Sequence, residues 1–177
     1  RLVEKENAGV LIVSAIHLFG QAGGLDQDIP SAQLPSRWNG LALEDCLNRN
    51  WFGNIKMTPV LLRDAKPLPN SSVFGDVVAC VVDDKSGFNP LALSKRTPVE
   101  GERVWLVSRV LDSSSTRHAA RVLGIEEGWL LYEFDAPDIE LRATSGAPVV
   151  NRWGEVIGVN AGGGEQDGVT IGVGTPV

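Results

Sequence analysis

The sequence has few residues of the kinds that bind metals, with 2 cysteines and 2 histidines among 177 residues. Two cysteines without paired histidines cannot form a zinc site, so we expect no metal. Cys80 stands inside the apolar run VVACVV and has the surroundings of a small buried hydrophobe, whereas Cys46 lies in LALEDCLNRN. A single disulfide between them stays an open alternative, and so few cysteines do not indicate a compartment.

Long apolar runs and a surplus of positive charge are also missing. No run approaches the roughly 20 residues that a membrane-spanning helix needs. The first residues, RLVEKENAG, have the pattern of neither a signal peptide nor a transit peptide, and a removed leader stays open. The net charge of −6 gives a long-range field that repels phosphates. We therefore expect no membrane span and no nucleic-acid partner.

Internal repeats and low-complexity segments are absent, which disfavours a solenoid. Instead, short apolar runs rich in β-branched residues recur between turn residues, and the 20 glycines and 10 prolines fit such frequent turns. This pattern predicts an all-β fold. The expected strands lie in AGVLIVSAIHLF, TPVLLRD, DVVACVVDD, RVWLVSRVL, GWLLYEF, APVVNRWGEVIGVN and GVTIGVGTPV.

Two hairpins are expected among these strands. The stretch NRWGE joins two strand-like runs between Val149 and Val159, with Gly154 available for a positive φ. A second pairing is expected between RHAARVLGI and WLLYEF across the turn EEG. Both hairpins lie in the second half of the chain.

Two segments depart from the strand pattern. Residues 34–53 place apolar residues at mixed spacing, which predicts one short helix there. Charge, proline and glycine gather in SKRTPVEGE, residues 94–102. We expect a linker at this point, between an N-terminal lobe of residues 1–93 and a C-terminal lobe of residues 94–177.

Three separated residues offer the parts needed for acyl transfer by a serine: a nucleophile, a base and a carboxylate that orients the base. Ser145 lies in RATSGAP, His17 ends the run VLIVSAIH, and Asp76 opens DVVACVV. Taken singly, each is more often a turn residue, a structural histidine or a strand-edge charge. Their order, His then Asp then Ser, makes the coincidence informative. The other carboxylates that could serve are Asp64, Asp83 and Asp84.

A nucleophile elbow is the alternative serine motif. It requires glycine two positions before and two positions after the serine, but Ala143 and Ala147 stand there. An α/β-hydrolase is therefore disfavoured. The order His, Asp, Ser is that of the chymotrypsin type.

The stretches VSAIH, GDVVACVV and TSGAPVVNRWGEVIGVNAGGG resemble the three signature regions of trypsin-like serine proteases. The likeness is closer to small bacterial members, such as the glutamyl endopeptidases and the periplasmic heat-shock proteases, and covers most of residues 9–177. It implies two antiparallel Greek-key β-barrels with the active site in the cleft between them. It also favours a secreted or periplasmic location over others.

The resemblance assigns a role to each matching position. Ser145 would be the nucleophile, His17 the general base and then acid, and Asp76 the residue that fixes the imidazole tautomer. The backbone N–H groups of Ala143 and Ser145 would form the oxyanion hole, and Gly146 would supply the sharp turn. No metal or organic cofactor is required.

The resemblance also suggests where a peptide or protein substrate would lie. The strand ending GVNAGG would pair with an extended substrate, with Asn160, Ala161 and Gly162 near the side-chain pocket. Ile139 falls where a pocket-floor residue is expected, and its apolar side chain disfavours a preference for Arg or Lys. Asn160 has an equal alternative as a residue that caps the strand.

Some positions depart from the family pattern. Ala143 stands where the family usually has glycine, which suggests an oxyanion hole that is strained or misformed. Thr144 replaces the aspartate with which animal digestive enzymes bind a newly cut N-terminus, so activation by that ion pair is not expected. Sixteen residues before His17 are few for a complete first barrel.

Three hypotheses follow from the sequence. The first is a serine endopeptidase that acts through an acyl-enzyme on Ser145. The second is a catalytically inactive module with the same fold that binds peptides or a protein partner, which Ala143 favours. The third is an unrelated β-sandwich whose turns imitate the motifs.

Overall fold

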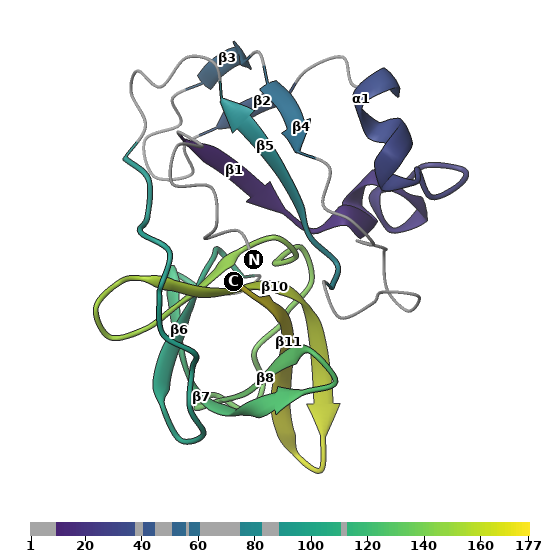
Figure 1. Cartoon of the computed structure of the whole chain (residues 1–177). Helices are drawn as coiled ribbons and strands as arrows, with labels where there is room; N and C mark the ends of the chain where they lie inside the picture. The colour runs from purple at the N-terminus through teal and green to yellow at the C-terminus, as the bar shows by residue number, and fades with distance from the viewer. Residues whose placement is uncertain are drawn as a thin grey trace.

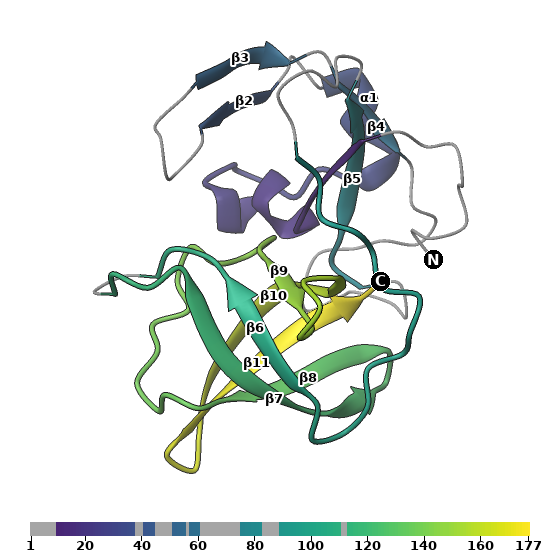
Figure 2. The ribbon, with the colours of Figure 1, turned by 90° about the vertical axis from the view of Figure 1, so that its left-hand side faces the viewer.

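The computed structural model describes residues 10–37, 41–44, 51–55, 57–60, 75–82, 89–110 and 113–177. Its described elements are strands, several short 3-10 turns and one four-residue helix. Figures 1 and 2 show two regions stacked on each other, with the first five strands in one and the last six in the other. The predicted all-β fold is confirmed.

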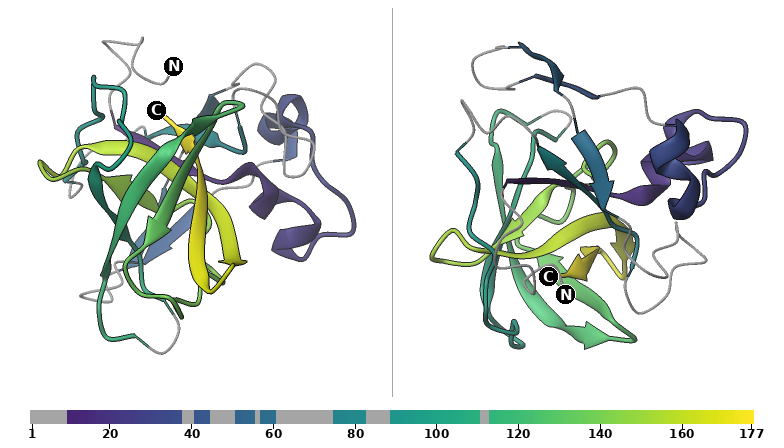
Figure 3. Two further views of the ribbon diagram at one scale, coloured as in Figure 1. Left: turned by 90° about the horizontal axis from the view of Figure 1, so that it is seen from below. Right: turned by 45° about the horizontal axis from the view of Figure 1, so that its top comes forward.

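The C-terminal region is a closed antiparallel barrel with the strand order β10-β11-β8-β7-β6-β9. Figure 3 shows this barrel from two further directions. Its strands are β6 (Arg103–Val107), β7 (Arg117–Glu126), β8 (Trp129–Phe134), β9 (Pro148–Val150), β10 (Val156–Gln166) and β11 (Val169–Pro176).

The barrel is held together by side chains that alternate along its strands. Along β8, every second residue is buried, as the two-residue period of a strand requires when one face meets a core. The core consists of Val104, Leu106, Ala120, Val122, Leu130, Tyr132, Phe134, Val149 and Ile157. Burying such side chains stabilises the fold by about 1.5–3 kcal/mol each for the large aliphatic and aromatic ones.

Both predicted hairpins form in this barrel. Val150 of β9 lies opposite Val156 of β10, and Gly154 in the turn has φ +77°. Strand β7 pairs with β8 from Ala120 opposite Phe134 to Glu126 opposite Trp129. A positive φ costs free energy for most residues but not for glycine, so each of these turns includes a glycine.

The N-terminal region contains two open sheets among the described residues. Strand β5 (Val78–Val82) lies between β1 (Leu11–Ser14) and β4 (Met57–Val60), while β2 (Leu41–Glu44) pairs with β3 (Trp51–Ile55). The described residues therefore close one of the two predicted barrels, the C-terminal one.

The helix expected within residues 34–53 is almost entirely wrong. Helix α1 covers only Leu34–Arg37, and β2 and β3 follow it as an antiparallel pair. Leu41 and Leu43 are two residues apart, which is the spacing of a strand and not of a helix face. The apolar spacing of this segment was ambiguous, and strand pairing determined its structure. Such pairing is a long-range interaction that local periodicity does not detect.

The predicted linker lies immediately before β6. At its start, Ser94 donates its backbone N–H to Val156 O at 2.8 Å. Just before it, Ala92 O accepts a hydrogen bond from Val156 N–H at 2.8 Å. Residues 92–94 are therefore bonded to the start of β10. The division at residues 93 and 94 stays a prediction.

Candidate active site

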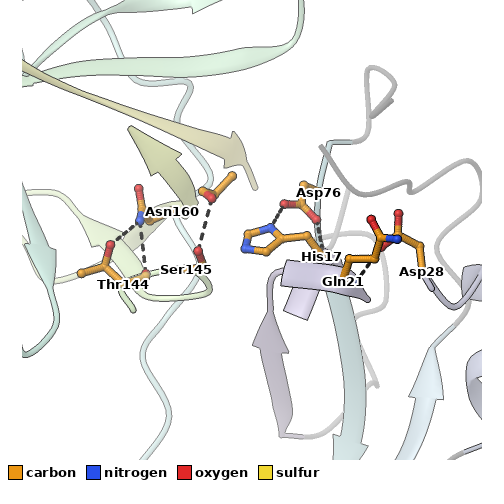
Figure 4. Close-up of polar contacts among 8 residues, drawn as sticks. His17, Gln21, Asp28, Asp76, Thr144, Ser145 and Asn160 are labelled. Carbon is orange, nitrogen blue, oxygen red and sulfur yellow. Dashed lines mark hydrogen bonds and ion pairs between the residues drawn. The ribbon is translucent and has the colours of Figure 1, made fainter. Parts of the chain in front are cut away.

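His17 lies just beyond β1, on the 3-10 turn Ile16–Phe19, and its side chain is 13% exposed. Its backbone N–H donates to Asp76 Oδ1 at 2.8 Å, and its ring Nδ1 bonds Asp76 Oδ2. Asp76 is 1% exposed and stands before β5, after Gly75, which has φ +65°. The two residues are 59 positions apart in the chain, and both carboxylate oxygens of Asp76 hold the histidine (Figure 4).

This double contact fixes the imidazole. A carboxylate beside Nδ1 favours the tautomer with the proton on Nδ1, because that N–H then has an acceptor. The other nitrogen, Nε2, is left as a proton acceptor. In Figure 4 the His17 ring points from its own region toward Ser145.

Ser145 lies in the turn that leads into β9, within the segment 142–147, called here the serine loop. Gly146 has φ +87°, its N–H donates to Asn160 O at 2.7 Å, and Asn160 N–H donates to Ala147 O at 2.8 Å. The loop is therefore fastened to β10. The Ser145 hydroxyl donates to Ala161 O at 3.3 Å, not to His17.

The serine loop contacts the segment that carries His17. A Cβ atom placed on Gly146 would lie 2.6 Å from Ser14 Oγ and 3.1 Å from the Ala15 nitrogen. Likewise, a Cβ on Gly75 would overlap the Thr175 side chain of β11. Glycine at both positions lets the two regions approach closely, which brings His17, Asp76 and Ser145 to the same interface.

Two amides of the serine loop are available as donors. Thr144 N–H donates to Leu141 O at 3.2 Å and Gly146 N–H to Asn160 O, but in the described structure neither the Ala143 nor the Ser145 N–H has a hydrogen-bond partner. These are the two amides predicted for an oxyanion hole. Ala143 has φ +61°, a left-handed conformation that is strained for alanine, and whether these amides form a working oxyanion hole stays a prediction.

A pocket of about 380 Å³ opens beside the serine loop. Ile139 and Gly162, both predicted near a side-chain pocket, line it, and sequence reasoning missed its other walls. The remaining lining residues are Pro137, Asp138, Glu140, Leu141, Arg142, Gly163, Gly164, Glu165 and Thr170. In the sequence, only the position of most of these residues, shortly before Ser145 or shortly after Asn160, could have pointed to the pocket.

The pocket rim carries an ion pair. Arg142 Nη2 lies 3.0 Å from Glu140 Oε2, and the Arg142 backbone N–H donates to Glu140 Oε1 at 2.9 Å. That backbone hydrogen bond, with the guanidinium second, lowers the pKa of Glu140. Glu140 is therefore a charged acceptor at neutral pH.

Asn160 and Ala161 are not at the pocket wall. Asn160 is completely buried, and its Nδ2 donates to Thr144 O at 3.1 Å and to Thr144 Oγ1 at 2.9 Å. Ala161 is 3% exposed and meets the site through its carbonyl oxygen. Asn160 lies two residues after Gly158, where a Cβ would meet Leu130 of the core, so both positions face the barrel interior.

The second histidine, the two cysteines and the rival carboxylates are not part of this site in the described structure. His118 bonds through Nε2 to Ser108 O at 3.1 Å, away from the serine loop. Burial raises the pKa of the Cys80 thiol, which is free. The other residues named from the sequence, Cys46, Asp64, Asp83 and Asp84, lie outside the described residues.

The described residues contain neither a membrane-spanning helix nor a cluster of metal-binding side chains. None of their helices is long and apolar enough to cross a membrane. Nor does this part of the chain contain a group of three or more His, Cys, Asp or Glu side chains placed to hold a metal ion.

Known proteins resemble this chain in structure and not in sequence. No family model and no curated protein matches it. The Rv3671c protease from M. tuberculosis, in its active form, is 16% identical, with a TM-score of 0.58 over 94% of this chain and 64% of that one. The serine endoprotease from Yersinia pestis is 16% identical, with a TM-score of 0.56 over 96% of this chain and 50% of that one.

A third solved structure, the HtrA-type protease AlgW with a decapeptide, is 13% identical. Its TM-score is 0.58 over 96% of this chain and 46% of that one. The chain thus spans about half the length of the last two proteins. Together with the closed six-stranded barrel, these likenesses show that the chain has the chymotrypsin-like fold of HtrA-type, trypsin-like serine proteases.

Proposed function

We propose that the protein is a serine endopeptidase that hydrolyses peptide bonds through an acyl-enzyme on Ser145. The observation that carries the proposal is the position of His17: its ring Nδ1 bonds Oδ2 of the buried Asp76, its backbone N–H donates to Oδ1, and the ring points toward Ser145 (Figure 4). A histidine fixed in this way leaves Nε2 as a base for a neighbouring hydroxyl.

The first half of the reaction forms the acyl-enzyme. The Ser145 hydroxyl turns away from Ala161 O and toward His17, and its oxygen attacks the scissile carbonyl carbon while Nε2 takes the proton. The carbonyl oxygen becomes an oxyanion that accepts hydrogen bonds from the unpartnered N–H groups of Ala143 and Ser145. The C–N bond then breaks, and His17 gives its proton to the leaving amine.

The second half returns the enzyme to its starting state. A water molecule attacks the ester carbon on Ser145 while His17 takes a proton from it. When the ester bond breaks, His17 protonates the serine oxygen, and a carboxylic acid leaves. Asp76 holds the ring through Nδ1 and stabilises the imidazolium that forms in each half.

The substrate would lie along β10. This strand is paired with β11 over most of its length but with β9 only as far as Val159. Asn160 still bonds the serine loop through its backbone N–H and carbonyl oxygen, so among the described residues the edge without a strand partner begins after Asn160, where an extended peptide can add as a strand. A side chain of that peptide would enter the pocket lined by Ile139 and Gly162.

The experiment is hydrolysis of a mixed peptide library, followed by mass spectrometry of the products. We expect new peptide termini with the unmodified protein and none with Ser145→Ala. Equal cleavage by both proteins would disprove the role of Ser145. The residues that flank the cleaved bonds would give the specificity.

A second candidate is a binding module that keeps the fold and has lost catalysis. Two observations favour it: the Ser145 hydroxyl bonds Ala161 O, and Ala143 takes a conformation that suits glycine. Peptides from the library that bind equally to the unmodified protein and to Ser145→Ala, with no product from either, would establish this function and exclude the first.

A further inference from the structure

A buried polar network lies beneath the serine loop. The Asn160 side chain accepts a hydrogen bond from the Tyr132 hydroxyl through Oδ1 and donates through Nδ2 to Thr144 O and Thr144 Oγ1. Thr144 Oγ1 donates in turn to Leu141 O at 2.6 Å. Asn160 and Tyr132 are completely buried and Thr144 is 1% exposed, so water does not compete for these bonds. Figure 4 shows the Asn160 amide directed at Thr144.

The network has only one orientation. Burial raises the pKa of the Tyr132 phenol far above its usual value, so its hydroxyl stays protonated and acts as a donor toward Asn160. The Thr144 carbonyl oxygen can only accept, so the NH₂ group of Asn160 faces Thr144 and its Oδ1 faces the Tyr132 hydroxyl. A flipped amide would place its oxygen against the Thr144 carbonyl oxygen, acceptor against acceptor, and leave that buried group without its donor.

The hydrogen bonds of Thr144 explain why the N–H groups of its neighbours, Ala143 and Ser145, have no partner in the described structure. The Thr144 N–H goes to Leu141 O, its carbonyl accepts from Ala147 N–H and Asn160 Nδ2, and its hydroxyl goes to Leu141 O. With every polar group of Thr144 satisfied inside the barrel, the N–H groups of its two neighbours are the ones left over. Because Thr144 is held this firmly, it can also keep Ala143 at φ +61°, although alanine prefers a negative φ.

We propose that Asn160 is the positioning residue of the serine loop. Held in one orientation by its bonds to the Thr144 carbonyl oxygen and the Tyr132 hydroxyl, it anchors Thr144, keeps Ala143 in the left-handed conformation and so directs the Ala143 and Ser145 amides outward. Asn160 and Thr144 do not touch the substrate and act only through these amides. The proposal rests on the proposed function, because it concerns the same oxyanion hole.

The test measures a surrogate of the acylation step, the rate at which Ser145 displaces fluoride from a fluorophosphonate to form a phosphonyl ester, in matched variants of the whole chain. Thr144→Val removes the hydroxyl at nearly constant volume, and Thr144→Ser keeps it. Because a small misplacement of a catalytic group costs up to about 100-fold, we expect the maximal rate of acylation to fall about 10- to 100-fold in Thr144→Val. Reagent affinity should stay unchanged, and Thr144→Ser should retain most of the rate.

Asn160→Ala should behave like Thr144→Val, and Tyr132→Phe, a milder change, should give a smaller loss in the same direction. Asn151→Ala is the matched control. Asn151 is also a buried asparagine of the barrel, 2% exposed, but it binds Glu155 and Trp153 in the β9–β10 turn. It should lose stability and keep its acylation rate.

A double variant separates positioning from a general loss of stability. Ala143→Gly removes the conformational preference that Asn160 opposes, so adding it to Asn160→Ala should restore part of the acylation rate. A purely structural Asn160 would show no such rescue. Hydrogen exchange of the Gly146 amide, which bonds Asn160 O, gives a readout independent of catalysis and should quicken in Asn160→Ala.

Two results would overturn this inference and leave the proposed function standing: normal acylation rates in folded Thr144→Val and Asn160→Ala, or an equal loss in Asn151→Ala. The absence of any adduct on the unmodified protein would instead reject the proposed function. In that case an unchanged Gly146 exchange rate in Asn160→Ala would also reject the anchoring role.

Discussion

At the scale of single residues, the candidate site depends on buried polar groups that are almost all satisfied. Asp76 bonds the His17 backbone and ring, and Asn160 bonds Thr144 and Tyr132. Of the buried side-chain polar atoms in the described residues, only Thr175 Oγ1 lacks a partner. Each such contact is worth little net free energy, but removing one partner leaves the other unsatisfied, at a cost of about 1–3 kcal/mol.

The substitution Asp76→Asn tests the orientation of the base. An amide at this position can donate to Nδ1 and so favours the wrong imidazole tautomer while preserving volume. We expect peptide hydrolysis to fall by about 10⁴-fold with little change in the circular dichroism spectrum. A folded Asp76→Asn variant with normal turnover would show that another carboxylate serves the histidine.

Ala143→Gly tests the strain in the serine loop. Relief of a left-handed alanine gains about 1–2 kcal/mol, and the greater entropy of unfolded glycine returns about 0.4–1 kcal/mol. We therefore expect the free energy of unfolding in urea to rise by about 0.5–1 kcal/mol. A decrease would mean that Ala143 makes a stabilising contact in the native state.

The Cys80 thiol should be inert in the folded protein. It is 3% exposed, and burial raises its pKa, so at neutral pH it is protonated and shielded. We expect iodoacetamide to modify Cys80 only after denaturant is added, as judged by mass spectrometry of the peptide that contains it. Rapid modification without denaturant would show that β5 opens readily.

At the scale of elements, the site is made by residues that lie just outside the ends of strands. His17 comes after β1, Asp76 precedes β5, and Ser145 precedes β9. Strands supply rigid supports, and their ends are free of the hydrogen-bond ladder, so side chains there can turn toward a cleft. The sequence identifies these strand ends because apolar runs stop at them.

Contact between the serine loop and the β1 end can be tested with two glycines of similar conformation. Gly146 has φ +87° and Gly154 has φ +77°, so alanine is strained by a similar amount at each. Only at Gly146 would the new Cβ meet Ser14 and Ala15. Because overpacking typically costs about 1–3 kcal/mol, Gly146→Ala should be less stable than Gly154→Ala by about that amount.

Gly146→Ala should also slow acylation of Ser145, whereas Gly154→Ala should not. Equal urea midpoints for the two variants would contradict the close approach of the serine loop to Ser14. In that case, the His17 segment and the serine loop would be farther apart than the structure has them.

At the scale of the whole molecule, sequence reasoning predicted what local patterns encode. The apolar runs joined by EEG and NRWGE, with glycines at 128 and 154, predicted the barrel hairpins, and the order of His17, Asp76 and Ser145 predicted which regions meet. Whether these three residues act as a triad stays a prediction until activity is measured.

What the sequence could not predict depends on long-range contacts. The bonds of Asn160 to Thr144 join residues 16 positions apart, and no local pattern reports this contact. The strand pair of Leu41–Glu44 with Trp51–Ile55 overrode a weak helix pattern in the same way. Tyr132 gave no signal as a partner of Asn160, because the two lie 28 positions apart and meet only in the folded barrel.

The measurement that tests the central claim most directly is the site and rate of fluorophosphonate labelling in the unmodified protein and in His17→Ala. We predict a single adduct on Ser145 in the unmodified protein and its near disappearance in a folded His17→Ala variant. An adduct on another residue, none on the folded protein, or undiminished labelling without His17 would contradict the account.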